Sequence, residues 1–216
     1  MKSKILVAIF LSMVTAANLI FAQNNITIQP DLTSHDSLVQ WKLDGANTWN
    51  KADVKLLLYK AGVPSGSFRR PSALAILKTK PFKYVSVEAD LRSTAPVDVI
   101  RRDLSIIVGY ESPARFYYIH LASITDNNHN GIFLVNNTDR QRIDSGKGTP
   151  QLKDTSWHHV KVIHDGITGL IQVFVDKSAE AVLEAIDKTI CCGQIGFGSF
   201  DDTGEFRNIN ITGFEN

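Results

Sequence analysis

The chain has 216 residues, of which 44% are hydrophobic and 21% charged, and this composition predicts one globular domain with a substantial core. Its 23 Lys and Arg residues nearly balance 22 Asp and Glu residues, so the formal net charge is only +1. A balanced charge without a basic stripe argues against a nucleic-acid-binding protein, and we predict no nucleic-acid partner.

The first residues have the pattern of a secretory signal peptide over residues 1–22. Lys2 and Lys4 precede an uncharged apolar run, and small residues stand near Ala22. Polar residues interrupt the run, which is short for a bilayer span of ~20 apolar residues, so a retained anchor is the weaker alternative. We therefore predict cleavage after Ala22 and a single exported domain, residues 23–216, secreted or periplasmic, with no membrane insertion of the mature chain.

The first half of this domain reads as short strands separated by Gly- and Pro-containing loops. The clearest alternation of apolar and polar residues runs from Tyr84 to Arg92, and Leu104 to Val108 continue the pattern. We also expect strands at 38–43, 54–59 and 72–79, with Trp49 in a loop between the first two.

The segment 115–122, RFYYIHLA, is the most informative strand. Side chains alternate between the two faces of a strand, so Tyr117 and the other odd-numbered residues would face the core. Tyr118 and His120 would then face the opposite surface. Aromatic rings and a histidine are unusual for plain solvent exposure, so this surface is the candidate ligand site; the alternative is that both residues are satisfied within the sheet.

The C-terminal half continues the pattern of strands. Val160 and Val162 alternate with polar residues, Asp165 to Gly169 supply a turn, and the alternation resumes up to Val175. Residues 178–186 fit either a helix or a short strand. About eleven or twelve strands at short spacing predict an all-β fold, a two-sheet antiparallel β-sandwich of jelly-roll type.

With these residues together, the chain resembles the concanavalin A-like lectin/glucanase superfamily, which includes laminin G-like modules. W-H-x-V-x-V from Trp157 and I-x-V-x-V-D ending at Asp176 look like the strand pair of that group. The strings GQIGFGSFDDTGEFRNINITG and FYYIHLA are similar to secreted bacterial domains described as 3-keto-disaccharide hydrolase or family 16 glycoside hydrolase-like. The resemblance covers about Trp41 to Gly213 and implies a concanavalin A-like jelly roll with saccharides on its concave sheet, often with an edge calcium ion.

Five residues form the predicted carbohydrate site on the concave sheet. Tyr118 offers a ring for stacking and a hydroxyl, and His120 a donor, acceptor or general base. We predict a domain that binds a polysaccharide or oligosaccharide. The alternative is a glycan-cleaving enzyme, a glycoside hydrolase or polysaccharide lyase, with His120 and Tyr118 as catalytic residues. The predicted binding residues are Tyr110, Arg115, Tyr118, His120 and Arg207.

The carboxylate pattern of family 16 glycoside hydrolases is incomplete here. Retaining hydrolysis needs two carboxyl groups ~5 Å apart. Glu88 and Asp90 fit the first two positions of the Glu-x-Asp-x-x-Glu strand that the resemblance implies, but Ser93 replaces the second glutamate. We therefore do not expect this mechanism on this strand.

Two loops are rich in oxygen ligands. Asp126 and Asn128 lie in one, and Asp201 and Asp202 in the other. Calcium takes roughly six to eight oxygen ligands, so these four residues are the candidate calcium ligands, although ordinary Asx-turn chemistry is the commoner use of such a cluster.

The two cysteines, Cys191 and Cys192, are adjacent. Neighbouring Cα atoms lie ~3.8 Å apart, below the ~4.4 Å minimum usual for a disulfide, so free thiols are favoured over a vicinal disulfide. Asn25, Asn136 and Asn210 begin Asn-x-Thr triplets, which would be glycan acceptors only in a eukaryotic source.

Overall fold

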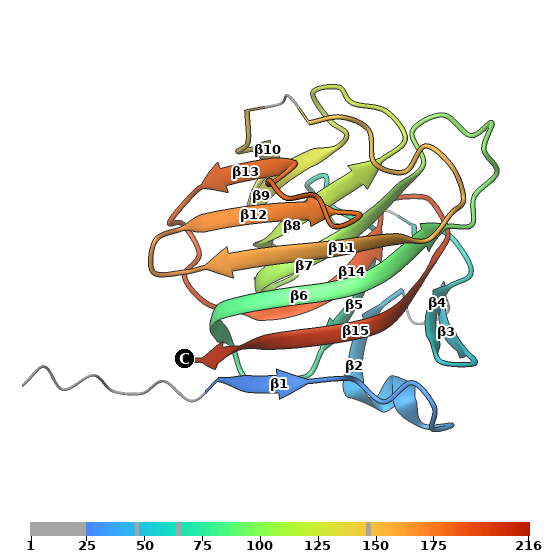
Figure 1. The fold of residues 1–216 in the computed structure, drawn as a ribbon, viewed down its shortest axis with the longest axis horizontal. Coiled ribbons are helices and arrows are strands. Elements are labelled where there is room, and N and C mark those ends of the chain that lie inside the picture. Colours follow the sequence, from blue (N-terminus) through green and yellow to red (C-terminus); the bar gives the residue numbers. More distant parts are fainter. Residues whose placement is uncertain (1–24, 46–47, 64–65, 146–147) are drawn as a thin grey trace, which may run out of the picture.

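The computed structural model describes residues 25–45, 48–63, 66–145 and 148–216. The predicted leader and its cleavage point lie outside these residues. Within them, fifteen strands and one short 3-10 helix form two antiparallel sheets that face each other, so the predicted all-β sandwich is confirmed (Figure 1). The extra strands beyond the expected eleven or twelve are short. No helix in the described part of the chain has the length and apolar character needed to cross a membrane.

The eight-stranded sheet, nearer the viewer in Figure 1, is called the front sheet below. Its order is β13-β12-β11-β6-β15-β4-β3, and β1 pairs with β15 at the side. Its strands are β1 (Ile26–Ile28), β3 (Trp49–Ala52), β4 (Lys55–Leu58), β6 (Phe82–Ser93), β11 (His158–Asp165), β12 (Leu170–Val175), β13 (Leu183–Ile186) and β15 (Gly204–Glu215).

The seven-stranded sheet is called the back sheet, and its order is β10-β9-β8-β7-β14-β5-β2. Segments far apart in sequence therefore meet, because β14 inserts between β7 and β5. Its strands are β2 (Trp41–Asp44), β5 (Ala73–Leu77), β7 (Asp103–Ser112), β8 (Arg115–Ala122), β9 (Gly131–Asn136), β10 (Gln141–Arg142) and β14 (Gln194–Ser199).

Three local predictions were wrong or incomplete. The strand predicted at 38–43 begins only at Trp41, because the 3-10 helix η1 (Ser37–Gln40) precedes it. Trp49 lies in β3 rather than in a loop, since its ring packs on Phe206 at 6.1 Å between centroids. The ambiguous segment 178–186 ends in strand β13 and forms no helix.

The main core fills the space between the sheets. Alternate residues of each long strand point into it: Val85 and Val87 from β6 meet Ile106 and Ile119 from the back sheet, all fully buried. Full burial of a side chain of this size stabilises the fold by about 1.5–3 kcal/mol. His164 also lies inside, and burial lowers its pKa to about 4, so it is neutral at pH 7.

A second apolar cluster lies on the outer face of the back sheet. This arrangement confirms the side-chain orientation predicted for residues 115–122, because Tyr117 faces the main core and Phe116 and Tyr118 face outward. The outward rings are nevertheless buried against each other and against Phe68 of the loop before β5, so they form no open platform. The cluster consists of Leu74, Ile76, Ile107, Tyr110, Phe116, Tyr118, Phe133, Val135 and Phe200.

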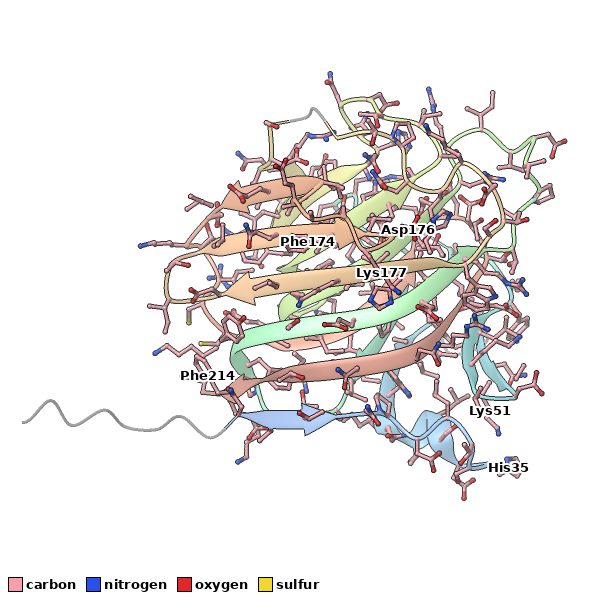
Figure 2. The ribbon with its side chains drawn as sticks, viewed as in Figure 1. His35, Lys51, Phe174, Asp176, Lys177 and Phe214 are labelled. Carbon is pink, nitrogen blue, oxygen red and sulfur yellow. The ribbon has the colours of Figure 1, made fainter. Side chains whose placement is uncertain are left out.

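The outer face of the front sheet is different in character. Alternate residues of β12, including Phe174, are only partly buried there, and Figure 2 shows Phe174 and Lys177 on this side.

Both cysteines are free, with Cys191 exposed and Cys192 buried. Burial raises the pKa of the Cys192 thiol to about 11.

Candidate functional site

A pocket of about 440 Å³ opens at one end of the back sheet. The register places its strand residues together, because Ser105 of β7 pairs with both His120 of β8 and Gly198 of β14. Loops from five other parts of the chain complete the wall. The lining residues are Arg69, Val99, Ile100, Arg101, Asp103, His120, Asn128, His129, Arg140, Phe200, Asp201 and Asp202.

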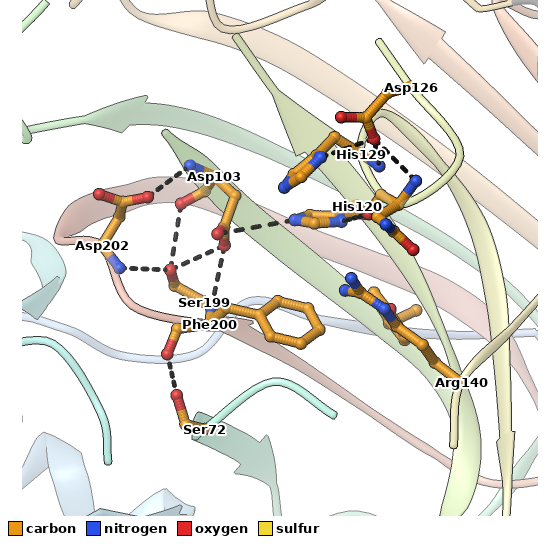
Figure 3. A network of polar contacts seen from close by, with 11 residues as sticks. Ser72, Asp103, His120, Asp126, His129, Arg140, Ser199, Phe200 and Asp202 are labelled. Atoms are coloured by element: carbon orange, nitrogen blue, oxygen red, sulfur yellow. Dashed lines mark hydrogen bonds and ion pairs between the residues drawn. The ribbon is translucent and has the colours of Figure 1, made fainter. Parts of the chain in front are cut away.

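Asp103 holds the floor of this pocket together (Figure 3). Its side chain is 2% exposed. One carboxylate oxygen accepts hydrogen bonds from the Ser199 hydroxyl at 2.8 Å and the Phe200 N–H at 3.0 Å. The other lies 3.6 Å from His120 Nε2. Burial alone would raise the pKa of Asp103, but these donors outweigh burial and hold the pKa below its usual value.

His120 is fixed from both sides. Its Nδ1 lies 2.8 Å from the carbonyl oxygen of Asn128, and because a carbonyl only accepts, Nδ1 carries the proton. Its Nε2 faces Asp103, is buried, and has no hydrogen-bond partner among the described residues. His120 is therefore held by its hydrogen bond to the Asn128 loop, and its Nε2 lies beside the Asp103 carboxylate.

The loop before β9 is built as a tight turn. Asp126 Oδ1 accepts from the N–H groups of Asn128 and His129 at 2.8 and 3.0 Å, and Nδ1 of His129 lies 2.7 Å away. The Arg142 guanidinium binds the carbonyl oxygens of Asp126 and Asn130 at 2.6 and 2.8 Å. Burial lowers the pKa of His129 despite its bond to Asp126. Asp126 thus serves the turn itself, which is the alternative that the sequence left open.

Two arginines flank the Phe200 ring. The guanidinium carbons of Arg140 and Arg69 lie 4.5 and 5.0 Å from the ring centroid. Arg140 also donates from Nη1 to the Tyr118 hydroxyl at 3.3 Å. The Phe200 backbone is held by Asp103 and by the Ser72 hydroxyl, which donates to the Phe200 carbonyl (Figure 3).

Asp103 also belongs to a cluster of three carboxylates. One oxygen each from Asp103, Asp201 and Asp202 lies within 4.8 Å of the others, and this is the only such acidic or metal-ligating group in the described ranges. Asp202 accepts a hydrogen bond from the Asp103 N–H at 2.9 Å. Burial, and then the charge of Asp103, raise the pKa of Asp202 to about 6.

The structure brings together part of the predicted site. His120, Asn128, Asp201 and Asp202 all line the pocket. Tyr118 lies beneath it, fully buried, where its hydroxyl supports Arg140 and burial raises its pKa.

The other predicted sugar-binding residues lie elsewhere. Tyr110 lines a separate cavity of about 430 Å³ beside the two cysteines. Arg115 forms an ion pair with Glu111 at 2.6 Å and donates a hydrogen bond to the carbonyl of Thr189 at 2.8 Å. Arg207 belongs to β15 of the front sheet, where it stacks on Trp157 at 3.9 Å. It is therefore separated from the pocket by the whole sandwich.

The sequence reasoning did not select Arg69, Asp103, Arg140 or Phe200. The one local signal was the position of Phe200, directly after a Gly-rich strand and before two aspartates. The contacts that gather these residues are long-range in sequence, and alternation within one strand does not reveal them.

The fold alone shows which solved proteins the chain is similar to. The chain has the concanavalin A-like lectin fold. No protein-family model matches the sequence, and no curated protein matches it either. The likeness therefore comes from solved structures, and it leaves the narrower resemblance to family 16-like domains a prediction.

Three solved structures show this likeness. Carbohydrate binding module CBM66 from Bacillus subtilis has a TM-score of 0.59 at 14% identity, covering 79% of this chain and 94% of that chain. The winged bean acidic lectin, solved with methyl-α-D-galactose, also has a TM-score of 0.59, at 10% identity over 88% of this chain and 99% of that one. A Bauhinia forficata lectin in complex with GalNAc gives 0.51, with 12% identity and coverage of 89% and 99%.

Proposed function

We propose that this protein binds a glycan in the pocket at the end of the back sheet. The observation that carries the proposal is the mixed lining of the pocket, which contains arginine donors and aspartate acceptors; Asp202 and Arg140 lie on opposite sides of the fixed residue Asp103 (Figure 3). Sugars present many hydroxyl groups that both donate and accept, and specific pockets meet them with a few well-placed polar groups. The fold supports the proposal, since solved proteins of the same fold include a carbohydrate binding module.

The lining residues have distinct roles in this proposal. Asp201 and Asp202 accept hydrogen bonds from sugar hydroxyls, and Arg69 and Arg140 donate to sugar oxygens. His120 is a positioning residue, because both its nitrogens face protein groups, Asn128 and Asp103. The partner is a polysaccharide or oligosaccharide, and the leader-like residues 1–22 support a meeting outside the cytoplasm.

The predicted calcium ion is proposed at the same end of the molecule. Asp103, Asp201 and Asp202 supply oxygen ligands, the type that calcium prefers. Asp126 is not in this group, because three donors of its own turn occupy one of its oxygens. A rise in melting temperature on adding calcium, absent in Asp201→Asn, is expected; no rise would remove the ion from the proposal.

A polysaccharide panel tests the main proposal. We expect the protein to be retarded in gels containing at least one polysaccharide, and the double variant Asp201→Asn/Arg140→Gln to lose most of that retardation. The matched control is Glu88→Gln on the outer face of the front sheet, which should bind like the native protein. Equal binding by the pocket variant, or loss of binding in the control alone, would contradict the proposal.

One observation favours a second candidate function, glycan cleavage. Asp103 and Asp202 are close carboxylates whose pKa values move in opposite directions, downward for Asp103 and up to about 6 for Asp202. Such a pair is typical of a glycosidase acid and its ionised partner. Binding is the better supported function because Asp103 is 2% exposed and its oxygens face protein donors. Reducing ends released by the native protein but not by Asp202→Asn would establish cleavage.

A further inference from the structure

The guanidinium groups of the pocket arginines differ from those of most other described arginines in forming no ion pair with a carboxylate; the only acidic contact of Arg69 that the described residues show is its backbone N–H, which donates to Asp139 at 2.8 Å. Elsewhere arginine side chains pair with carboxylates, for example Arg92 with Glu205 at 2.7 Å and Arg142 with Asp144 at 2.5 Å. Arg69, Arg101 and Arg140 form no ion pair with any residue of the described ranges. All three line the pocket. Unpaired positive charge is thus concentrated at the place where a ligand would enter.

Arg140 is held in a fixed position for such a ligand. Its guanidinium stacks on Phe200 at 4.5 Å and lies 5.4 Å from the Phe133 ring, and its Nη1 is anchored by Tyr118. Figure 3 shows it reaching over Phe200 towards His120. Stacking occupies the faces of a guanidinium and leaves its edge N–H groups for other acceptors. Arg69 flanks the same ring at 5.0 Å, and the backbone N–H of Arg140 donates to the backbone carbonyl of Arg69 at 3.3 Å.

The aspartates of the pocket do not neutralise these arginines. No ion pair joins Asp201 or Asp202 to Arg69 or Arg140 in the part of the chain described. Asp103 instead faces His120, and its other bonds hold Ser199 and Phe200. One cavity of about 440 Å³ therefore holds arginine donors and aspartate acceptors that, among the described residues, form no ion pair with each other.

We propose that the glycan bound here is acidic, with a sugar carboxylate or sulfate on Arg69 and Arg140 and sugar hydroxyls on Asp201 and Asp202. This inference rests on the proposed function and narrows its ligand. A neutral sugar would use the aspartates but leave desolvated guanidinium groups without a counter-charge, which is costly. An acidic sugar satisfies both sides, because the planar fork of arginine matches a carboxylate or a similar oxyanion.

The test compares sugars that differ only in the anionic group. D-galacturonic acid, D-galactose and D-galactose 6-sulfate, and the corresponding glucose set, are titrated into the native protein and followed by protein-observed NMR. We expect at least one charged sugar to bind about tenfold more tightly than its neutral partner, a difference that one well-formed charged contact supplies. Stronger binding of the uronic acid or of the sulfate identifies the anion.

Variants assign the effect to the arginines. Arg140→Gln and Arg69→Gln should bring charged and neutral sugars to within about twofold, and Arg140→Lys should give an intermediate preference, because lysine keeps the charge without the fork. Arg207→Gln, on the opposite sheet, is the matched control and should keep the native preference. Preference for neutral sugars, discrimination that survives both pocket variants, or no pocket shift with any of the six sugars would overturn the inference. Neutral sugars bound equally well in the pocket would leave the proposed glycan binding standing.

Discussion

Each outer face of the sandwich carries a pair of arginines stacked on an aromatic ring, which is Trp157 on the front sheet and Phe200 on the back sheet. On the front sheet, Arg207 and Arg92 lie 3.9 and 4.8 Å from the Trp157 ring. On the back sheet, Arg140 and Arg69 lie 4.5 and 5.0 Å from the Phe200 ring. The stacking is similar in both places, so the difference between the pairs must come from what else each guanidinium meets.

The front pair belongs to a closed network of charges. Arg92 binds Glu205 at 2.7 Å, and Arg207 lies 3.6 Å from Asp90. Lys55 and His159 add further contacts to the same carboxylates, at 3.0 and 2.9 Å. Glu205 is buried and Asp90 partly buried, and several donors match each carboxylate, so losing one contact costs on the order of 1 kcal/mol. The comparison teaches that the same residue types form a network of paired charges on one sheet and an arginine pair without an ion-pair partner among the described residues on the other.

The largest expected effect follows from replacing the buried carboxylate under the open pair. Asp103→Asn removes the charge that faces His120 and disturbs the bonds to Ser199 and Phe200, so the free energy of unfolding should fall by about 3–5 kcal/mol. Urea unfolding measures the loss. The matched control, Asp90→Asn in the front network, should cost about 1 kcal/mol or less. Equal losses would show that the two faces are energetically alike.

A smaller effect is expected from the anchor of Arg140. Tyr118→Phe removes only the hydroxyl that accepts from Arg140 at 3.3 Å and keeps the buried ring. One such hydrogen bond contributes about 1 kcal/mol, so affinity for a charged sugar should fall about fivefold while affinity for its neutral partner changes little. Calorimetric titration of both sugars measures the change. An equal loss for both would show that Tyr118 acts on the fold rather than on Arg140.

The smallest effect is a pH dependence whose sign separates acidic from neutral ligands. Burial raises the pKa of Asp202 to about 6, with Asp103, Asp201 and Arg102 as its charged neighbours. As pH falls from 7.5 to 5, Asp202 loses its negative charge, so an acidic sugar that stays ionised should bind about two- to threefold more tightly.

The opposite sign is expected for a neutral sugar, because a protonated Asp202 is a poorer acceptor for its hydroxyls. Asp202→Asn should flatten both profiles. An acidic sugar that binds more weakly at pH 5 than at pH 7.5 would contradict the assigned arrangement of charges.

The comparison also shows which parts of the molecule the sequence could reveal. Alternation along residues 115–122 correctly predicted that Tyr117 faces the core and that Tyr118 and His120 face away, because strand periodicity is local. It could not show that the outward rings cover one another, which depends on neighbouring strands. It also could not assign Arg207 to the front sheet, since β15 pairs with β6 more than a hundred residues earlier in the chain.

The pocket was the least predictable feature for the same reason. Arg69 and Arg140 meet over Phe200 only after three loops from distant parts of the chain come together. Asp201 and Asp202 were recognised as oxygen-rich, but their companion Asp103 stands almost a hundred residues away. Local composition indicated ligand chemistry at this end, and long-range packing decided which residues take part.

The most direct test of the account is the structure of the protein crystallised with D-galacturonic acid and, separately, with D-galactose 6-sulfate. The account predicts that the carboxylate or sulfate of at least one of them lies within hydrogen-bonding distance of Arg140 or Arg69, with ring hydroxyls on Asp201 or Asp202. A sugar seated instead beside Tyr110 and Cys191, or on the Trp157 face of the front sheet, would contradict it.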